Sequence, residues 1–234
     1  MKNVWEFNQT LDPDQTKFRV VLLGAEFNRC EKNPFGDHDP DVFMAYVFEK
    51  EIISKQEKAL IYCGMHHAFT RYIQSYNDDR MGNIIYRKYP EKTFTIFLHS
   101  PWVSDRGWNR RQVKPVNGVI DSAMDLLNNI PIGFDVRNTI IGELRANNTY
   151  YAFGYEDFKL EDFCDGYIFL LPFKQVEFVS VDPNFYDEYN LNKVKEFMKC
   201  TGYSDRQLRK ITQKKAIKMF TEKAKIHYGL WLKN

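Results

Sequence analysis

The chain has little cysteine and no long apolar run. The first argues against a zinc site and the second against a membrane-spanning segment. Its four cysteines form no C-x-x-C pair, which argues against a zinc site and favours reduced thiols. They are Cys30, Cys63, Cys164 and Cys200. No apolar segment approaches the roughly 18–20 residues that cross a bilayer, and the first residues lack a secretory-signal pattern. We therefore expect a cytoplasmic protein without membrane contact.

Common catalytic and nucleotide-binding motifs are missing as well. The sequence has no G-x-G-x-x-G, no Walker A segment, no G-x-S-x-G and no H-E-x-x-H. The dinucleotide-binding, phosphate-loop, serine-hydrolase and zinc-protease classes therefore lack support. Internal repeats and a Ser/Gly-rich linker are absent too. What is present, 234 residues with 44% hydrophobic and 16% aromatic side chains, suffices for a globular body with a sizeable core.

Apolar runs alternate with helical patterns over the first part of the chain. Residues 17–24 and 57–64 have the pattern of buried strands that end in glycine, and residues 41–55 and 67–76 after them have helical spacing. Asp41 is the expected N-cap of the first helix. The later elements are expected as strands at 93–101, 131–136 and 167–173 and a helix at 118–128. This order predicts an α/β fold with a mostly parallel sheet flanked by helices.

The chain divides near residue 183 into an α/β domain, residues 1–182, and a C-terminal helical region, residues 183–234, packed on it. Residues 204–234 carry a net charge of +7 and the rest of the chain −5. Ser204 and Gln207 match a capping box, and apolar residues recur at helical spacing after them. A docked helix with a solvated lysine face is the simplest interpretation. An anionic partner at 204–234 is an alternative, whereas nucleic-acid binding is disfavoured because the aromatics lie on the apolar stripe.

The segment Gly64-Met65-His66-His67-Ala68 is the strongest functional signal, because it follows an apolar run directly. Open α/β sheets bind ligands at the carboxyl ends of their strands. Histidine has an unperturbed pKa of about 6.5, so His67 is the candidate base for activating water. Glu26 or Asp135 would hold its imidazole, and Arg29 would stabilise a developing oxyanion.

Three further residues are candidate ligand-binding groups: His66, His99 at the exit of the strand at 93–101, and Asp165. His66, His67 and His99 with a carboxylate also suit a divalent metal such as zinc or iron. Haem has less support because it also needs an apolar slot, so the cofactor stays open. Each residue has a structural interpretation too. The histidines can satisfy backbone groups, Glu26 and Arg29 can pair at i,i+3, and Asp135 and Asp165 are ordinary turn formers.

These segments, in this order, resemble the erythromycin-esterase, ChaN and Tiki-type superfamily over residues 17–173. The resemblance rests on five segments: Leu23-Gly24-Ala25-Glu26, Met44-Ala45, the G-x-x-H-A of Gly64 to Ala68, Gly133-Phe134-Asp135 and Asp165-Gly166-Tyr167. The family implies an α/β sheet with His and Glu at strand ends, hydrolysis of ester or peptide bonds, a haem-binding branch, and His67 as a site histidine. The family's earlier Gly-Glu-x-x-His segment has no counterpart here.

The sequence thus predicts a hydrolase-like protein that acts on a small-molecule ligand through His67. One alternative is a non-catalytic ligand-, metal- or haem-binding protein on the same scaffold. Another is an interaction module that uses the basic C-terminal helix. Because the earlier family segment has no counterpart, the chain also fits a lone later half, a degenerate binding protein or a piece of a longer polypeptide. The substrate, the oligomeric state and the pathway stay open.

Overall fold

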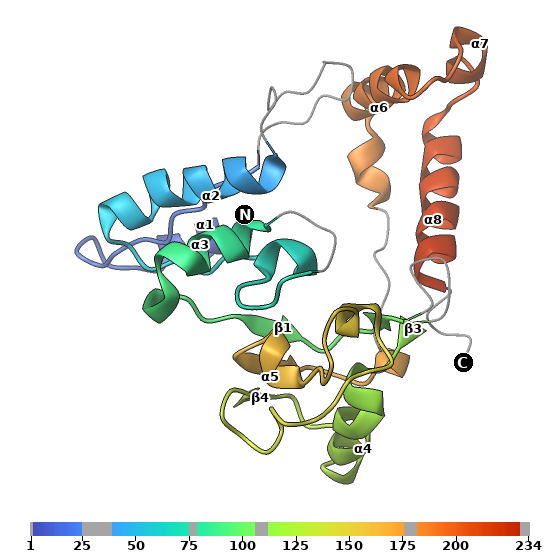
Figure 1. The fold of residues 1–234 in the computed structure, drawn as a ribbon. Coiled ribbons are helices and arrows are strands. Elements are labelled where there is room, and N and C mark those ends of the chain that lie inside the picture. The colour runs from blue at the N-terminus through green and yellow to red at the C-terminus, as the bar shows by residue number, and fades with distance from the viewer. Residues whose placement is uncertain (1, 25–38, 75–78, 106–111, 176–181, 230–234) are drawn as a thin grey trace.

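The computed structural model describes residues 2–24, 39–74, 79–105, 112–175 and 182–229 (Figure 1). Helices and strands are mixed along this part of the chain, as the sequence predicts. In the described segments, every helix is too short or too polar to cross a membrane. Glu26 and Arg29 lie outside the described residues.

The main sheet has three strands in the order β1-β5-β4 and is mixed rather than mostly parallel. They are β1 (Ile96–Leu98), β4 (Ile132–Asp135) and β5 (Gly166–Phe169). β5 runs parallel to β1 and antiparallel to β4, with Asp135 opposite Gly166. The chain returns from β4 to β5 beside the point where β4 ends, since the Val136 amide donates to the Asp165 carbonyl over 2.8 Å. β5 must therefore run back along β4, which corrects the expectation of a mostly parallel sheet.

Two of the expected strands are not formed. Residues 17–23 and 57–64 are extended but have no strand pairing in the structure. Side chains in the second segment alternate between the core and solvent. Ile61 and Cys63 pack against the core of the nearby helices, whereas Leu60 and Tyr62 are 90% and 89% exposed. The unbroken apolar sequence predicts burial on both faces. The structure buries one face only, which explains the error.

The N-terminal half is built from helices packed beside these extended segments. They are α1 (Lys2–Gln9), α2 (Pro40–Glu51), the 3-10 turns η1 (Ile53–Lys55) and η2 (Met65–Ala68), and α3 (Met81–Lys88). α2 is confirmed, but its N-cap is Asp39, whose carboxylate accepts the Asp41 amide over 2.7 Å with Pro40 between them. Pro at the first helical position needs no hydrogen bond there. The helix expected at 67–76 is wrong, since η2 ends at Ala68.

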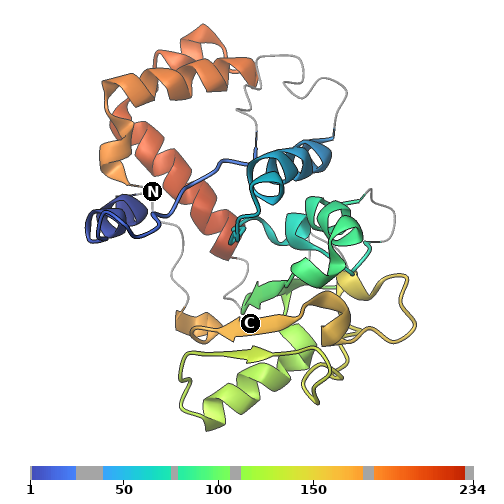
Figure 2. The ribbon, with the colours of Figure 1, turned by 90° about the vertical axis from the view of Figure 1, so that its left-hand side faces the viewer.

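The largest core packs the sheet, seen as a ribbon in Figure 2, against the loops around it. Most of its buried side chains are aromatic. Phe163 of α5 (Leu160–Phe163) is at its centre and contacts the rings of Phe69, Trp102 and Tyr151 at centroid distances of 5.0 to 5.2 Å. Such aromatic pairs contribute about 0.5–1.5 kcal/mol each beyond area burial. Figure 2 also shows α4 running along the edge of the sheet formed by β4.

Short elements connect the sheet to its surroundings. They are η3 (Pro90–Lys92), the antiparallel pair β2 (Trp102–Val103) and β3 (Gln112–Val113), η4 (Pro115–Gly118), α4 (Val119–Leu126), η5 (Tyr150–Ala152) and η6 (Phe173–Gln175). Val116 is fully buried with φ 43°, and Asn117 follows with φ 58°. A β-branched residue in this left-handed region is strained. α4 begins directly after this segment. Asp121, in the first turn of α4, lies near His99 at the end of β1.

The C-terminal region is helical, with η7 (Pro183–Tyr186), α6 (Glu188–Cys200), α7 (Asp205–Leu208) and α8 (Gln213–Gly229). It has a core of its own around Tyr186 and Met198. The expected capping box is confirmed, because the Ser204 amide donates to Gln207 Oε1 over 2.8 Å and Ser204 caps α7. Figure 1 shows α6, α7 and α8 standing beside the body. The packing of this region on residues 1–182 stays a prediction.

The cysteines depart in part from the expected reduced thiols. Cys63 and Cys164 are free, and burial raises the pKa of both thiols. Cys200 is disulfide-bonded. The expectation of four reduced thiols is therefore wrong at Cys200.

Candidate active site at His67

His67 forms the shortest bond of the site, with Asp41 of α2. Its Nδ1 lies 2.6 Å from Asp41 Oδ1. The same oxygen accepts the Met81 amide over 2.8 Å, so it acts as an acceptor and His67 Nδ1 carries the hydrogen. The exposed fractions of the side chains are 38% for His67 and 3% for Asp41. A buried carboxylate thus orients an open imidazole, and no described residue bonds to its Nε2.

The position of Asp41 follows from the starts of two helices. Asp41 lies in the first turn of α2, and Met81 is the first residue of α3. Helix N-termini have unpaired amides and a positive end of the helix dipole, which favour a negative charge. Arg80 adds its guanidinium, with Nη1 3.4 Å from Asp41 Oδ2. The carboxylate is therefore stabilised by amides and cations that the fold supplies.

The loop after His67 is fixed to α3. A Cβ at Gly82 would lie 2.3 Å from the Phe69 carbonyl oxygen, so only glycine permits this contact. The Asn83 amide donates to the carbonyls of Thr70 and Tyr72 over 2.7 and 2.8 Å, and its oxygen accepts the Arg80 amide. These bonds set where α3 starts relative to the histidine turn.

His66 belongs to the same site but differs in chemistry. Its Nε2 lies 3.1 Å from the Tyr151 hydroxyl. Burial, and then the nearby charges of Arg80 and His67, lower the pKa of His66 to about 4. Burial also raises the pKa of Tyr151, so its phenol keeps the hydrogen. His66 is therefore a neutral hydrogen-bonding group at neutral pH, not a second base.

His99 lies at the exit of β1, as expected, but has other partners. Its Nδ1 is 2.8 Å from the Tyr167 hydroxyl, and its ring stacks on Phe173 with centroids 4.1 Å apart. Its Nε2 lies 3.7 Å from Asp121 Oδ1, which Lys114 also approaches within 3.2 Å. Burial opposes ionisation of Asp121, but His99 and Lys114 together outweigh it and lower its pKa. His99 does not join the His67 site through any described contact.

The two expected aspartates also lie elsewhere. Asp165 is buried, accepts the Thr95 amide over 2.8 Å and pairs with Arg71 at 3.1 Å, so it anchors the starts of β1 and β5. Asp135 is exposed at the end of β4 and bonds to no histidine of the described chain. The carboxylate that holds His67 is Asp41, where the sequence analysis named Glu26 or Asp135.

The three-histidine metal site is not supported by the geometry. Within the described segments, no group of three or more His, Cys, Asp or Glu side chains is arranged to hold a metal ion. His66, His67 and His99 instead bond to Tyr151, Asp41 and Tyr167 respectively. Three different partners keep the three imidazoles from converging on one point.

Sequence reasoning missed Asp41, Arg80 and Tyr151 as site residues. A signal for Asp41 was available, since Pro40 at the first helical position identifies Asp39 as the cap and leaves the next carboxylate free. Arg80 and Tyr151 reach Asp41 and His66 across 39 and 85 residues of sequence. Contacts of that length depend on the tertiary fold, and no local pattern marks them.

Comparisons with known proteins add no relative. No protein-family model matches the chain, and neither curated proteins nor solved structures give a match. The superfamily resemblance therefore depends on the sequence segments alone.

Proposed function

We propose that the protein is a hydrolase in which His67 activates water. The observation that carries the proposal is the 2.6 Å bond between the open imidazole of His67 and the buried carboxylate of Asp41. A fixed imidazole whose Nε2 bonds to no described residue has the arrangement that a general base needs. The erythromycin-esterase, ChaN and Tiki-type resemblance supports the same residue. It also suggests esters or peptides as substrates.

The proposed first step is attack of water on a carbonyl carbon. His67 Nε2 takes one proton from the water as the new C–O bond forms and the carbonyl electrons move to its oxygen. Asp41 stabilises the resulting imidazolium through Nδ1. When the bond to the leaving group breaks, the imidazolium returns the proton to that group. The atoms balance with water as the only co-reactant, and neither a metal nor a covalent intermediate is needed.

Arg80 is the proposed electrostatic group for the tetrahedral oxyanion. Its contacts to Asp41 and Gln74 are both long, at 3.4 Å. Its Nε is buried without a hydrogen-bond partner. A guanidinium with unused donors stabilises developing negative charge most where water is excluded. We assign to Arg80 the role that the sequence predicted for Arg29, which lies outside the described residues, and neutral His66 would orient the substrate.

The test is ester hydrolysis by the full chain, with p-nitrophenyl acetate as the first probe and a peptide panel as the second. His67→Ala should lower kcat/KM by about 10²–10⁴, the usual contribution of a general base. Free imidazole should restore part of the rate. Asp41→Asn should lower it too, because its amide would turn the imidazole to the wrong tautomer. Asp125→Asn, an exposed carboxylate on α4, is the matched control and should leave the rate unchanged.

Hydrolysis that His67→Ala leaves intact would contradict the proposal. Ligand binding that depends on His67 without any turnover would favour the non-catalytic alternative on the same scaffold. Asp41 also bonds to Met81, so the melting temperature of each variant must accompany its rate. A loss of rate in His67→Ala without a loss of stability separates a catalytic role from a structural one.

Location and partners form a separate part of the proposal. We keep the cytoplasm as the proposed location because Cys63 and Cys164 are free thiols, which suit a reducing compartment. The disulfide at Cys200 is the observation against it. Cell fractionation tests the location. Deletion of residues 204–234 tests whether the basic helix binds an anionic partner.

A further inference from the structure

A cavity of about 260 Å³ lies away from His67, between the loop after β4 and α5. Its lining combines both signs of charge with one amide and one phenol. The lining residues are Arg71, Arg137, Asn138, Tyr155, Glu161 and Asp162. None of the His67 site residues contributes to it, so the proposed hydrolysis does not account for this cavity.

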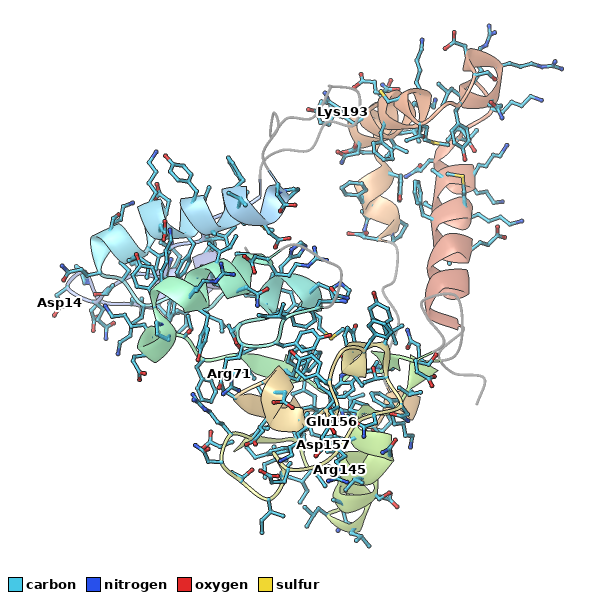
Figure 3. The ribbon with its side chains drawn as sticks, viewed as in Figure 1. Asp14, Arg71, Arg145, Glu156, Asp157 and Lys193 are labelled. Carbon is cyan, nitrogen blue, oxygen red and sulfur yellow. The ribbon has the colours of Figure 1, made fainter. Side chains whose placement is uncertain are left out.

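Two guanidinium groups form the positive side. Arg71, labelled in Figure 3 beside α5, is held rigidly, since Nη2 donates to the Glu161 carbonyl over 2.6 Å and pairs with Asp165 Oδ1 at 3.1 Å. Arg137 is held loosely, with its nearest carboxylate oxygen, also Asp165 Oδ1, 3.9 Å away. One buried carboxylate therefore faces two cations. Arg137 has five N–H donors and no closer acid among the described residues.

Two consecutive carboxylates in the first turn of α5 form the negative side. Glu161 Oε2 accepts the Asn138 amide over 3.2 Å, and Asp162 Oδ2 accepts the Lys159 amide over 2.8 Å. Each carboxylate can accept further bonds through its other oxygen. The cavity thus offers acceptors for a cation a short distance from donors for an anion.

Asn138 and Tyr155 complete the lining of the cavity. Asn138 lines the cavity and has φ 59°, a left-handed conformation that asparagine tolerates. The Tyr155 hydroxyl accepts the Ile73 amide over 3.1 Å, which holds its ring in place. The volume suits a ligand of a few heavy atoms rather than a polymer.

We propose that this cavity binds a free α-amino acid. The carboxylate of the ligand would pair with Arg137, and its ammonium group with Glu161 and Asp162. Charges of both signs in one small cavity penalise a ligand that carries a single charge, because half of the lining would repel it. A zwitterion satisfies both sides at once.

Ligand-detected NMR on the full chain tests the proposal with glycine, L-alanine, L-serine and L-leucine. Acetate and methylamine serve as half-ligands that carry one charge each. We expect the amino acids to bind at least about tenfold more tightly than either half-ligand, since each charged hydrogen bond contributes to affinity. Arg137→Ala and Glu161→Gln should each weaken amino-acid binding by at least about tenfold.

One variant serves as a control and a second tests selectivity. Arg145→Ala removes an arginine of an exposed ion pair with Asp157, both labelled in Figure 3, and should leave binding unchanged. Asn138→Gly keeps the left-handed backbone while it removes the amide, and should alter which amino acid binds best. Ester hydrolysis at His67 should be the same in all four variants, so failure here is distinct from failure of the proposed function.

Three outcomes would overturn the inference. The first is that no amino acid binds at millimolar concentration. The second is that acetate or methylamine binds as tightly as the amino acids. The third is that Arg137→Ala binds as well as the unaltered chain at an unchanged melting temperature.

Discussion

The described part of the chain contains two histidine–aspartate pairs, and they are built in opposite ways. In the first, Asp41 is buried and His67 is 38% exposed, with 2.6 Å between Oδ1 and Nδ1. In the second, the His99 side chain is 1% exposed and Asp121 12%, with 3.7 Å between Nε2 and Oδ1. A hidden acid that orients an open imidazole prepares a base for a ligand. A hidden imidazole with a more accessible acid serves packing.

The largest effect on stability should come from the buried acid of the first pair. Asp41→Ala leaves His67 Nδ1, the Met81 amide and Arg80 without their shared acceptor, and breaking such a buried set costs about 3 kcal/mol. Asp121→Ala should cost less, about 1–2 kcal/mol, because Asp121 has only a long 3.7 Å contact with the buried His99 and an ion pair with the exposed Lys114. Urea denaturation measures both. Equal losses would show that the two aspartates play the same structural part.

For the histidines, substitution in the second pair should cost more stability than substitution in the first. His99→Ala opens a cavity among Tyr167, Phe169 and Phe173 and should cost about 2–3 kcal/mol. His67→Ala should cost less than about 1 kcal/mol, because its ring is partly in solvent. The same denaturation series gives both values. If His67→Ala lost more unfolding free energy than His99→Ala, the His67 imidazole would be a packing group, and the proposed difference between the two histidines would be wrong.

Lowering the pH should reduce the stability of the folded protein through His66. Its pKa in the folded protein is about 4, and in the unfolded chain about 6.5. Between these values the unfolded chain binds a proton that the folded protein does not, so stability is lost as pH falls from about 6.5 to 4. After allowance for partial exposure the loss is about 1–2 kcal/mol. Denaturation across this range should show a smaller loss for His66→Gln, and an identical profile would argue against a buried neutral His66.

The smallest effect should come from Lys114. The Lys114 side chain is 59% exposed, and its ammonium group pairs with a carboxylate that His99 already faces. Exposed pairs of this kind contribute less than about 1 kcal/mol. Lys114→Ala should therefore change the urea midpoint little, with or without added salt. A large change would mean that the second pair depends on its outer cation.

The sequence predicts many of the local elements and little of their assembly, and it is wrong for the strands at 17–24 and 57–64 and the helix at 67–76. α2, α4, β1, β4, β5 and the capped helix α7 were all expected near their observed places, because apolar periodicity and cap residues are local signals. The direction of β5 was not predicted, since it depends on Asp165 returning beside Val136 across the 136–165 connection. Apolar runs could not show that Leu60 and Tyr62 face outward, because burial on a second face is a tertiary property.

The site residues also fall into those that a local sequence pattern identifies and those that depend on the tertiary fold. A glycine turn after an apolar run identified His66 and His67, and the structure places both beside Asp41 and Arg80. The structure places Asp41 rather than Asp135 on His67 Nδ1, and the other candidate, Glu26, lies outside the described residues. The sequence did not single out Asp41 for this role, because carboxylates look alike in sequence until the helix starts are known. His99 shared the sequence signal of a strand exit, yet Phe173 covers its ring. A position at the end of a strand thus makes a residue a candidate for a functional site. The packing around its side chain determines whether it is available to a ligand.

The contact at Gly82 has a consequence for the position of His67. Gly82 has no space for a Cβ beside the Phe69 carbonyl, and Asn83 donates to the carbonyls of Thr70 and Tyr72, so α3 and the loop after His67 are packed in one fixed arrangement. The other end of α3 contacts α2, where Lys88 pairs with Glu49 over 2.7 Å. The place of the imidazole therefore depends on how α3 packs against α2, as well as on the residues that touch it.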